Sequence, residues 1–133
     1  MGRRLILDTN ILIAIERGVS EVVALFADDD ELAIAAVSRA ELLAGPAMTG
    51  DPALRARRQA TALAVLSAVT VLDYSTSTSD RHAELLAHTR KSGLPRGPHD
   101  LIIAAHAAET GRRVLTRDVK ARFGGLPGVS LAG

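Results

Sequence analysis

The chain has 133 residues, of which 47% are hydrophobic and 23% charged, with a formal net charge of +1 at pH 7. This length predicts one domain, residues 1–133, with a core of its own, and the composition argues against disorder. The lack of cysteine excludes disulfides and thiolate metal sites. No apolar run approaches the roughly 20 residues of a membrane span, so we expect a cytoplasmic protein without a membrane partner.

Short apolar runs, typical of buried strands, alternate along the chain with longer stretches typical of helices. Strands are predicted at residues 5–7, 32–37, 69–72, 114–115 and 129–131. Helices are predicted at residues 11–17, 21–27 after a Ser20 cap, 38–44 before a break at Gly45–Pro46, 53–68, 80–91 and 99–109, with a short one ending at Phe123. This alternation indicates an α/β fold with a central, mostly parallel sheet of about five strands flanked by helices.

Four acidic residues stand where strands end or where the neighbouring helices begin. Asp8 and Asp118 follow predicted strands, whereas Glu41 and Asp100 lie in the first turn of predicted helices. Right-handed parallel crossovers bring the carboxyl ends of strands to one edge of the sheet, where these acids can meet. Clustered carboxylates repel one another, and a divalent cation bound through oxygen removes that conflict. With no cysteine, Mg²⁺ or Mn²⁺ is favoured over zinc, which suits phosphodiester cleavage.

Each acid also has a purely structural explanation. Ser38 and Glu41 match a capping box, Asp100 suits the positive end of a helix, and Asp118 suits a turn. A charge after a buried strand needs a partner or a cation, so Asp8 is the hardest to explain in this way. Asp73, after the third predicted strand, is a further candidate carboxylate or simply a loop residue.

Four segments carry one combined pattern, in the order Leu5–Asn10, Ser38–Leu42, Pro98–Ala105 and Leu115–Asp118. In order and spacing this pattern spans essentially the whole chain and resembles the PIN-domain ribonucleases. More narrowly, it resembles the VapC toxins of toxin–antitoxin pairs. The resemblance implies a single PIN-like domain in which the first strand is central and Asp8 lies at a switch point. It also implies metal-dependent endonucleolytic cleavage of RNA.

The resemblance further assigns roles to individual residues. It implies that the four acids are both catalytic residues and metal ligands, holding one or two Mg²⁺ (or Mn²⁺) ions that activate the attacking water: Asp8, Glu41, Asp100 and Asp118. Substrate-positioning roles fall to Thr9, Asn10 and Thr116, with Arg117 as a candidate RNA contact. Weaker candidates are Arg96 and the Arg55–Arg58 face for RNA, and His99 and His106 as general bases.

The implied partners are an RNA substrate and a VapB-like antitoxin whose tail covers the acidic site. We expect a homodimer or a toxin–antitoxin hetero-oligomer. The alternative is a non-catalytic PIN-like binding module that uses its acidic site to grip a basic partner, without any need for a divalent cation. A phosphotransfer domain built on Asp8 is disfavoured, because Asn10 stands where a second aspartate is expected.

Overall fold

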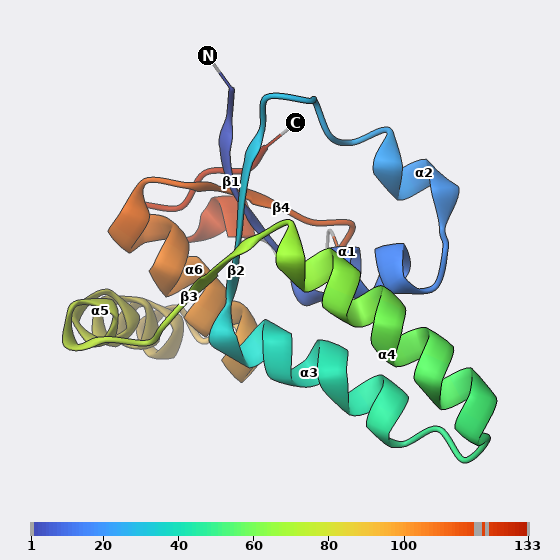
Figure 1. The fold of residues 1–133 in the computed structure, drawn as a ribbon. Coiled ribbons are helices and arrows are strands. Elements are labelled where there is room, and N and C mark those ends of the chain that lie inside the picture. The colour runs from blue at the N-terminus through green and yellow to red at the C-terminus, as the bar shows by residue number, and fades with distance from the viewer. Residues whose placement is uncertain (1, 119–120, 122, 133) are drawn as a thin grey trace.

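A computed structural model of the chain describes residues 2–118, 121 and 123–132. At its centre lies a four-stranded sheet in the order β3–β2–β1–β4, with every neighbouring pair parallel (Figure 1). The strands are β1 (Arg4–Leu7), β2 (Glu31–Ala35), β3 (Thr70–Leu72) and β4 (Arg113–Leu115). The predicted α/β class and parallel sheet are confirmed, with β1 in the interior of the sheet.

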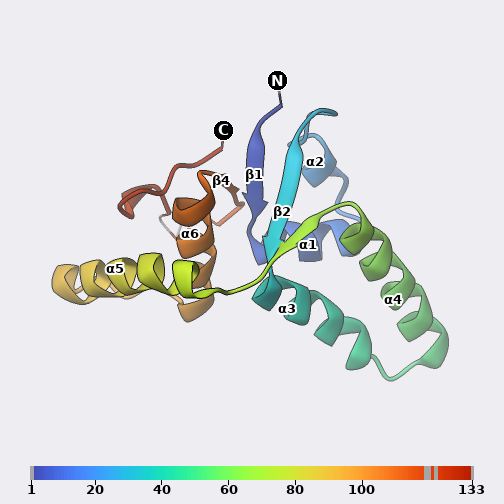
Figure 2. The ribbon, with the colours of Figure 1, turned by 60° about the vertical axis from the view of Figure 1, so that its left-hand side comes forward.

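Helices cover both faces of the sheet. They are α1 (Thr9–Glu16), α2 (Ser20–Val23), α3 (Ala36–Ala47), α4 (Pro52–Ser67), α5 (Thr76–Ser92), α6 (Pro98–Thr110) and the 3-10 helix η2 (Phe123–Gly125). One face packs against α1, α3 and α4, and the other against α6, with α5 lying outside α6 (Figures 1 and 2). Among the described residues, no helix is long and apolar enough to cross a membrane.

The side chains of β1 divide the core into two parts. Ile6 belongs to the cluster beneath α6, whereas Leu5 and Leu7 belong to the cluster beneath α1 and α4. All three side chains are fully buried, because successive residues of a strand point to opposite faces and helices cover both. A continuous apolar run therefore correctly predicted a strand buried on both sides.

The fifth predicted strand, residues 129–131, is reduced to a single parallel bridge between Val114 and Leu131. Val114 N–H donates to Ser130 O at 2.9 Å, and Ala132 N–H donates to Val114 O at 2.9 Å. The sheet thus has four strands rather than about five, because a pairing of one residue is too short to form a ladder. Of the predicted short helix ending at Phe123, residues 119, 120 and 122 lie outside the described residues.

Helix α3 differs from its predicted form at both ends. It begins at Ala36, so Ala35 is the N-cap and the predicted capping box of Ser38 and Glu41 is wrong. Ala36 and Val37 extend the apolar run of β2, and sequence alone does not show where a short buried run changes from strand to helix. The predicted break at Gly45–Pro46 is also wrong, because Pro46 lies in the last turn, where few backbone hydrogen bonds are lost.

The predicted starts of α1, α2 and α5 were also misplaced, and α1 begins at Thr9 rather than at Ile11. Helix α5 begins at Thr76 rather than at Asp80, because Ser75 and Thr78 form a capping box. Helix α2 begins at Ser20, which was predicted as a cap, and it ends at Val23 rather than Ala27. The helix predicted over residues 53–68 is confirmed as α4 within one residue at each end.

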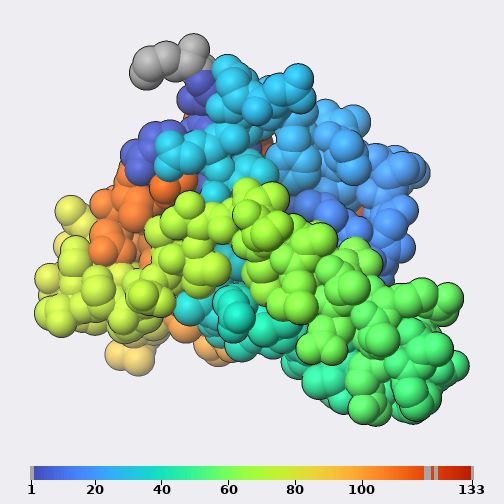
Figure 3. Space-filling view, viewed as in Figure 1, coloured from blue at the N-terminus to red at the C-terminus, as the bar shows by residue number. Residues whose placement is uncertain are grey.

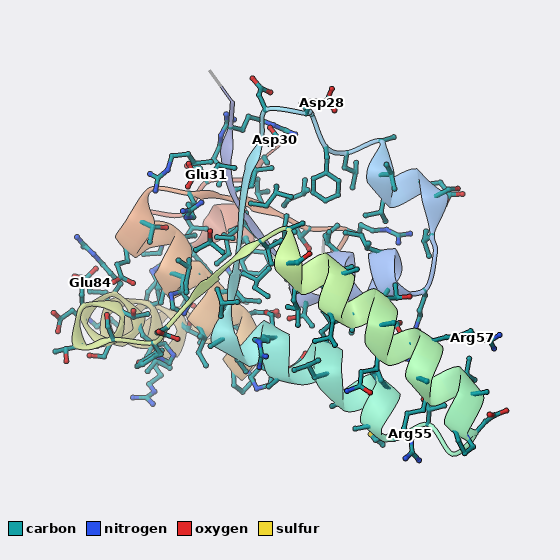
Figure 4. All side chains as sticks on the ribbon, viewed as in Figure 1. Asp28, Asp30, Glu31, Arg55, Arg57 and Glu84 are labelled. Atoms are coloured by element: carbon teal, nitrogen blue, oxygen red, sulfur yellow. The ribbon has the colours of Figure 1, made fainter. Side chains whose placement is uncertain are left out.

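Helices α3 and α4 form an arm that projects from the body (Figure 3). Arg58 Nε donates to Glu16 Oε1 at 2.9 Å, which fixes the arm to α1. Arg55 Nε donates to Thr49 O at 2.8 Å within the loop that joins the two helices. Arg55 and Arg57 lie toward the end of the arm, far from Asp28 and Asp30 (Figure 4). Two arginines of the predicted RNA-contacting face therefore have structural contacts.

Candidate functional site

The sheet changes direction at β1, which pairs with β2 on one side and with β4 on the other. In open parallel sheets, ligands bind beyond the carboxyl ends of the strands at such a switch point. Asp8 follows β1, and Thr116 to Asp118 follow β4. The topology therefore brings the beginning and the end of the chain together at this edge.

Asp8 is held there by hydrogen bonds to both of its carboxylate oxygens. Its Oδ1 accepts from Thr9 N at 2.8 Å, as the N-cap of α1, and its Oδ2 accepts from Thr116 Oγ1 at 2.6 Å. Asp8 N–H also donates to Leu115 O at 2.9 Å, extending the contact between β1 and β4. With only 5% of the residue exposed, its carboxylate has a fixed position.

Thr116 connects Asp8 to Asp118. Its hydroxyl donates to Asp8 and accepts from Asp118 N at 2.9 Å, so one side chain orders two acids. We call Asp8, Thr116 and Asp118 the strand half of the site. A substrate-positioning role for Thr116 stays a prediction, but its contacts give it a clear part in orienting Asp8.

Two buried hydroxyls join α1 to α3. Thr9 Oγ1 and Ser38 Oγ lie 2.8 Å apart, and both residues are buried. Thr9 therefore acts on Asp8 through its backbone N–H, whereas its side chain is turned toward α3. Sequence reasoning missed this pair because it assigned Ser38 to a helix cap.

Glu41, His99 and Asp100 form what we call the helix half of the site. Glu41 lies in the second turn of α3 rather than the first, because that helix begins earlier than predicted. His99 and Asp100 lie in the first turn of α6, and His99 Nδ1 donates a hydrogen bond to Glu41 Oε1. A Cβ atom on Gly97, the N-cap of α6, would lie only 3.0 Å from Asp100 Oδ2, so this carboxylate folds back over the start of its helix.

Neighbouring negative charges act on two of the four acids, Asp8 and Asp100. Burial raises the pKa of Asp8, hydrogen bonds from Thr116 and Thr9 oppose that rise, and the charges of Asp118 and Glu41 add to it. Burial also raises the pKa of Asp100, together with the charges of Asp8, Asp118 and Glu41, while His99 opposes it. All four predicted acids therefore lie near one another at the same edge of the sheet.

The donors at this edge are those that a hard divalent cation prefers. They are carboxylate oxygens, joined by Asn10, whose buried Oδ1 has no hydrogen-bond partner among the described residues. Among the residues that the structure describes, no three acidic or histidine side chains lie close enough together to hold an ion in their present positions. The chemical types of these donors fit Mg²⁺ or Mn²⁺, whereas their spacing in this structure does not yet form a closed ligand set.

The remaining candidates lie around this edge or away from it. Arg117 is exposed beside Asp118, and Arg96 Nη1 donates to Ala121 O at 2.6 Å, which ties the loop before α6 to the segment after β4. His106 is buried against the ring of Tyr74, at a centroid distance of 6.3 Å. Its Nδ1 lies 3.8 Å from Glu109 Oε2, so its contacts are with the α5–α6 layer.

Comparison with known proteins gives the same answer as the fold. The PIN domain family model matches residues 5–123. The tRNA(fMet)-specific endonuclease VapC of Shigella flexneri is 30% identical over 127 residues, covering 92% of this chain and 94% of that protein. The chain therefore belongs to the PIN-domain family and, within it, to the VapC group.

Solved structures support this assignment. DNA-bound VapBC from Salmonella typhimurium superimposes with a TM-score of 0.82 at 26% identity, covering 99% of this chain and 98% of that one. VapBC-5 from Mycobacterium tuberculosis superimposes with a TM-score of 0.77 at 32% identity, covering 96% of each chain. The resemblance stated from four sequence segments, and the PIN fold that it implied, are confirmed.

Proposed function

We propose that this protein is a metal-dependent endoribonuclease toxin that cleaves RNA phosphodiester bonds in the cytoplasm. The observation that carries the proposal is that four acids gather at the switch point of the sheet: Thr116 links Asp8 to Asp118, and the charges of Asp118 and Glu41 act on both Asp8 and Asp100. Carboxylates that raise one another's pKa destabilise the folded chain at neutral pH, and such a cost is typical of a site built to bind a cation.

Under this proposal, the four acids and Asn10 Oδ1 would hold Mg²⁺ or Mn²⁺. When bound, the cation would offset the carboxylates, promote deprotonation of a water molecule and withdraw charge from the phosphate. The chain's own residues contribute orientation: Thr9 N–H and Thr116 fix Asp8, and Thr116 also fixes the backbone at Asp118. Arg117, exposed beside Asp118, would contact the RNA backbone.

The substrate class is supported by the relatives. The Shigella flexneri protein is named a tRNA(fMet)-specific endonuclease, and we extend to this chain the coarser property of cleaving structured RNA. With two phenylalanines and one tyrosine, the chain has few rings on which to stack unpaired bases. Recognition would rest on phosphates and RNA shape, and we expect affinity to fall steeply with added salt.

Cleavage of transfer RNA by the purified chain tests the proposal, in Mg²⁺ and in excess chelator. The key variant is Asp100→Asn, and its matched control is Asp73→Asn, which removes an exposed carboxylate after β3. Cleavage should require the cation and Asp100 but not Asp73. Undiminished cleavage by Asp100→Asn would contradict the assignment of the site. If neither the wild type nor any variant binds Mn²⁺ or cleaves RNA, the binding-module alternative is favoured.

We also propose that a VapB-like antitoxin binds this chain, in a toxin–antitoxin hetero-oligomer or on a homodimer. The support is that solved structures similar to it include VapBC complexes. The surface also carries an apolar groove of about 290 Å³, with Val23 and Phe26 in its lining, of the kind that protein partners cover. Co-expression with the product of the adjacent reading frame should give a complex of defined mass and suppressed cleavage. Failure to co-purify would contradict this part.

A further inference from the structure

One contact in the helix half is not explained by the proposed chemistry. His99 Nδ1 donates a hydrogen bond to Glu41 Oε1, joining the first turn of α6 to the second turn of α3, across 58 positions of sequence. The side chains are 52% and 36% exposed, so the contact lies at the rim of the site rather than inside it. Glu41 is thus held by an imidazole side chain, whereas Asp8 is held by a backbone amide and a threonine hydroxyl.

A stabilising role does not account for this contact. Ion pairs between exposed side chains contribute little to stability, because water and salt screen them. Helix α3 is already fixed to the body by the buried Thr9–Ser38 pair and by the core around Leu42. Helix α6 is fixed by Leu101 and Ile103, both buried in the other core cluster. Loss of the His99 ring should therefore leave the fold intact.

The contact has a direct consequence for cation binding. A carboxylate oxygen that accepts a hydrogen bond from an imidazole has part of its charge compensated, and a hard cation must compete for it. His99 also lies close enough to Asp100 to influence the charge of its carboxylate. The imidazole is therefore placed to weaken the hold of the helix half on a cation.

We propose that His99 is a positioning residue that binds Glu41 in the metal-free protein, so that a divalent cation gains Glu41 as a ligand only by displacing the imidazole. This inference rests on the metal site of the proposed function. Under this inference, the strand half and Asp100 supply the initial affinity for the cation. Glu41 contributes to that affinity only after its carboxylate has been released from His99.

Calorimetric titration of Mn²⁺ into the purified full-length chain, without RNA and at one fixed pH, tests this inference. His99→Leu removes the donor and should tighten Mn²⁺ binding by about fivefold, the scale of an exposed ion pair. His99→Gln keeps an N–H donor and should stay close to wild type. His88→Leu, which removes an exposed histidine from α5, is the matched control and should leave affinity unchanged.

A double-mutant cycle with Glu41→Gln supplies a result that a structural role would not give. In the wild-type background Glu41→Gln should weaken Mn²⁺ binding by about twofold, because the carboxylate is already engaged. In the His99→Leu background the same change should cost about tenfold. Thermal unfolding in chelator should be the same for wild type and His99→Leu within about a degree.

Two outcomes would overturn the inference while leaving the metal site in place. One is unchanged or weakened Mn²⁺ binding by His99→Leu, and the other is an equal cost of Glu41→Gln in both backgrounds. Asp8→Ala distinguishes these from failure of the proposed function. If Mn²⁺ binding survives Asp8→Ala, or if no variant binds Mn²⁺ at all, both the metal site and the role of His99 are wrong.

Discussion

The two halves of the acidic edge are built differently. In the strand half, Asp8 is 5% exposed and receives hydrogen bonds at 2.8 and 2.6 Å, and the hydroxyl that binds it also orders Asp118. In the helix half, Glu41 is more than a third exposed and is held by a half-exposed histidine from another helix. One half is preorganised by the backbone and buried donors, whereas the other can rearrange at little cost.

This difference shows how one edge can combine precision with adaptability. Groups that must keep a fixed geometry gain from buried partners with fixed rotamers. Groups that complete a ligand set after binding gain from exposure and a long side chain. Four changes to the chain, taken from the largest expected effect to the smallest, test whether the halves differ in this way.

Removing one charge from each half should give unequal losses. Asp8→Asn should lower RNA cleavage by about 100-fold or more, because in the proposed metal site a ligand with a fixed position would contribute several kcal/mol to stabilising the transition state. Glu41→Gln should lower the cleavage rate by only about tenfold, because we propose that Glu41 joins the cation only after His99 has released it. The measurement is single-turnover cleavage at saturating Mg²⁺, and equal losses in the two variants would remove the distinction.

Removing the shared hydroxyl should damage the strand half without touching a carboxylate. Thr116→Val keeps the shape of the side chain but removes the donor to Asp8 Oδ2 and the acceptor for Asp118 N–H, while Thr9 N–H still donates to Asp8 Oδ1. The change should weaken Mn²⁺ affinity by about 10- to 100-fold, as for other residues that orient metal ligands. Thr116→Ser restores the hydroxyl and should recover most of the affinity in the same calorimetric titration. Wild-type affinity in Thr116→Val would mean that Asp8 is oriented by other contacts.

Removing the buried hydroxyl pair should loosen the connection between α1 and α3. Ser38→Ala leaves Thr9 Oγ1 buried without its partner and should lower the free energy of unfolding by about 1 kcal/mol. Thr9→Val should cost a similar amount, but the double variant should cost little more than either, because no unpaired hydroxyl remains. Urea denaturation of the four proteins measures this. Strictly additive losses would show that the hydroxyls do not act as a pair.

The smallest effect concerns the pH dependence of stability in the absence of metal. Burial raises the pKa of Asp100 above 3.8, its unfolded value, so the folded chain binds more protons than the unfolded chain between the two values. Its contribution to stability is therefore lost as pH rises through that window, and it remains lost at neutral pH. Asp100→Asn should be the more stable protein at pH 7 in chelator, and the gain should shrink as pH falls toward 4. A destabilised Asp100→Asn at pH 7 would contradict the sign.

The sequence predicted the strands better than the junctions between elements. Leu5 to Leu7 form a continuous apolar run between charged residues, and such a run is typical of a strand that is buried on both faces. The start of α3 was missed because Ala36 and Val37 are as compatible with a strand as with a helix. The N-cap of α5 at Ser75 was not predicted because it lies in a run of serine and threonine residues, several of which are equally suitable as helix N-caps.

The sequence predicted that the four acids lie near one another, because parallel strands direct their carboxyl ends to one edge of the sheet. The sequence did not predict the contacts that hold these acids in place. The hydroxyls of Thr9 and Ser38 are 29 positions apart, and nothing in their types or spacing marks them as partners. His99 was singled out beside Asp100, but its contact with Glu41 depends on the helical phase of α3, which shifted when that helix began two residues early.

The hydrogen bond between Asp8 and Thr116 spans 108 positions of sequence. A ribosome therefore makes Asp8 well before it makes Thr116. Between these two points, the growing polypeptide carries Asp8, Glu41 and then Asp100 without the strand that completes the sheet beside β1. The strand half can form only after β4 and Thr116 have been made. A chain cut short before β4 therefore lacks the strand half of the site altogether.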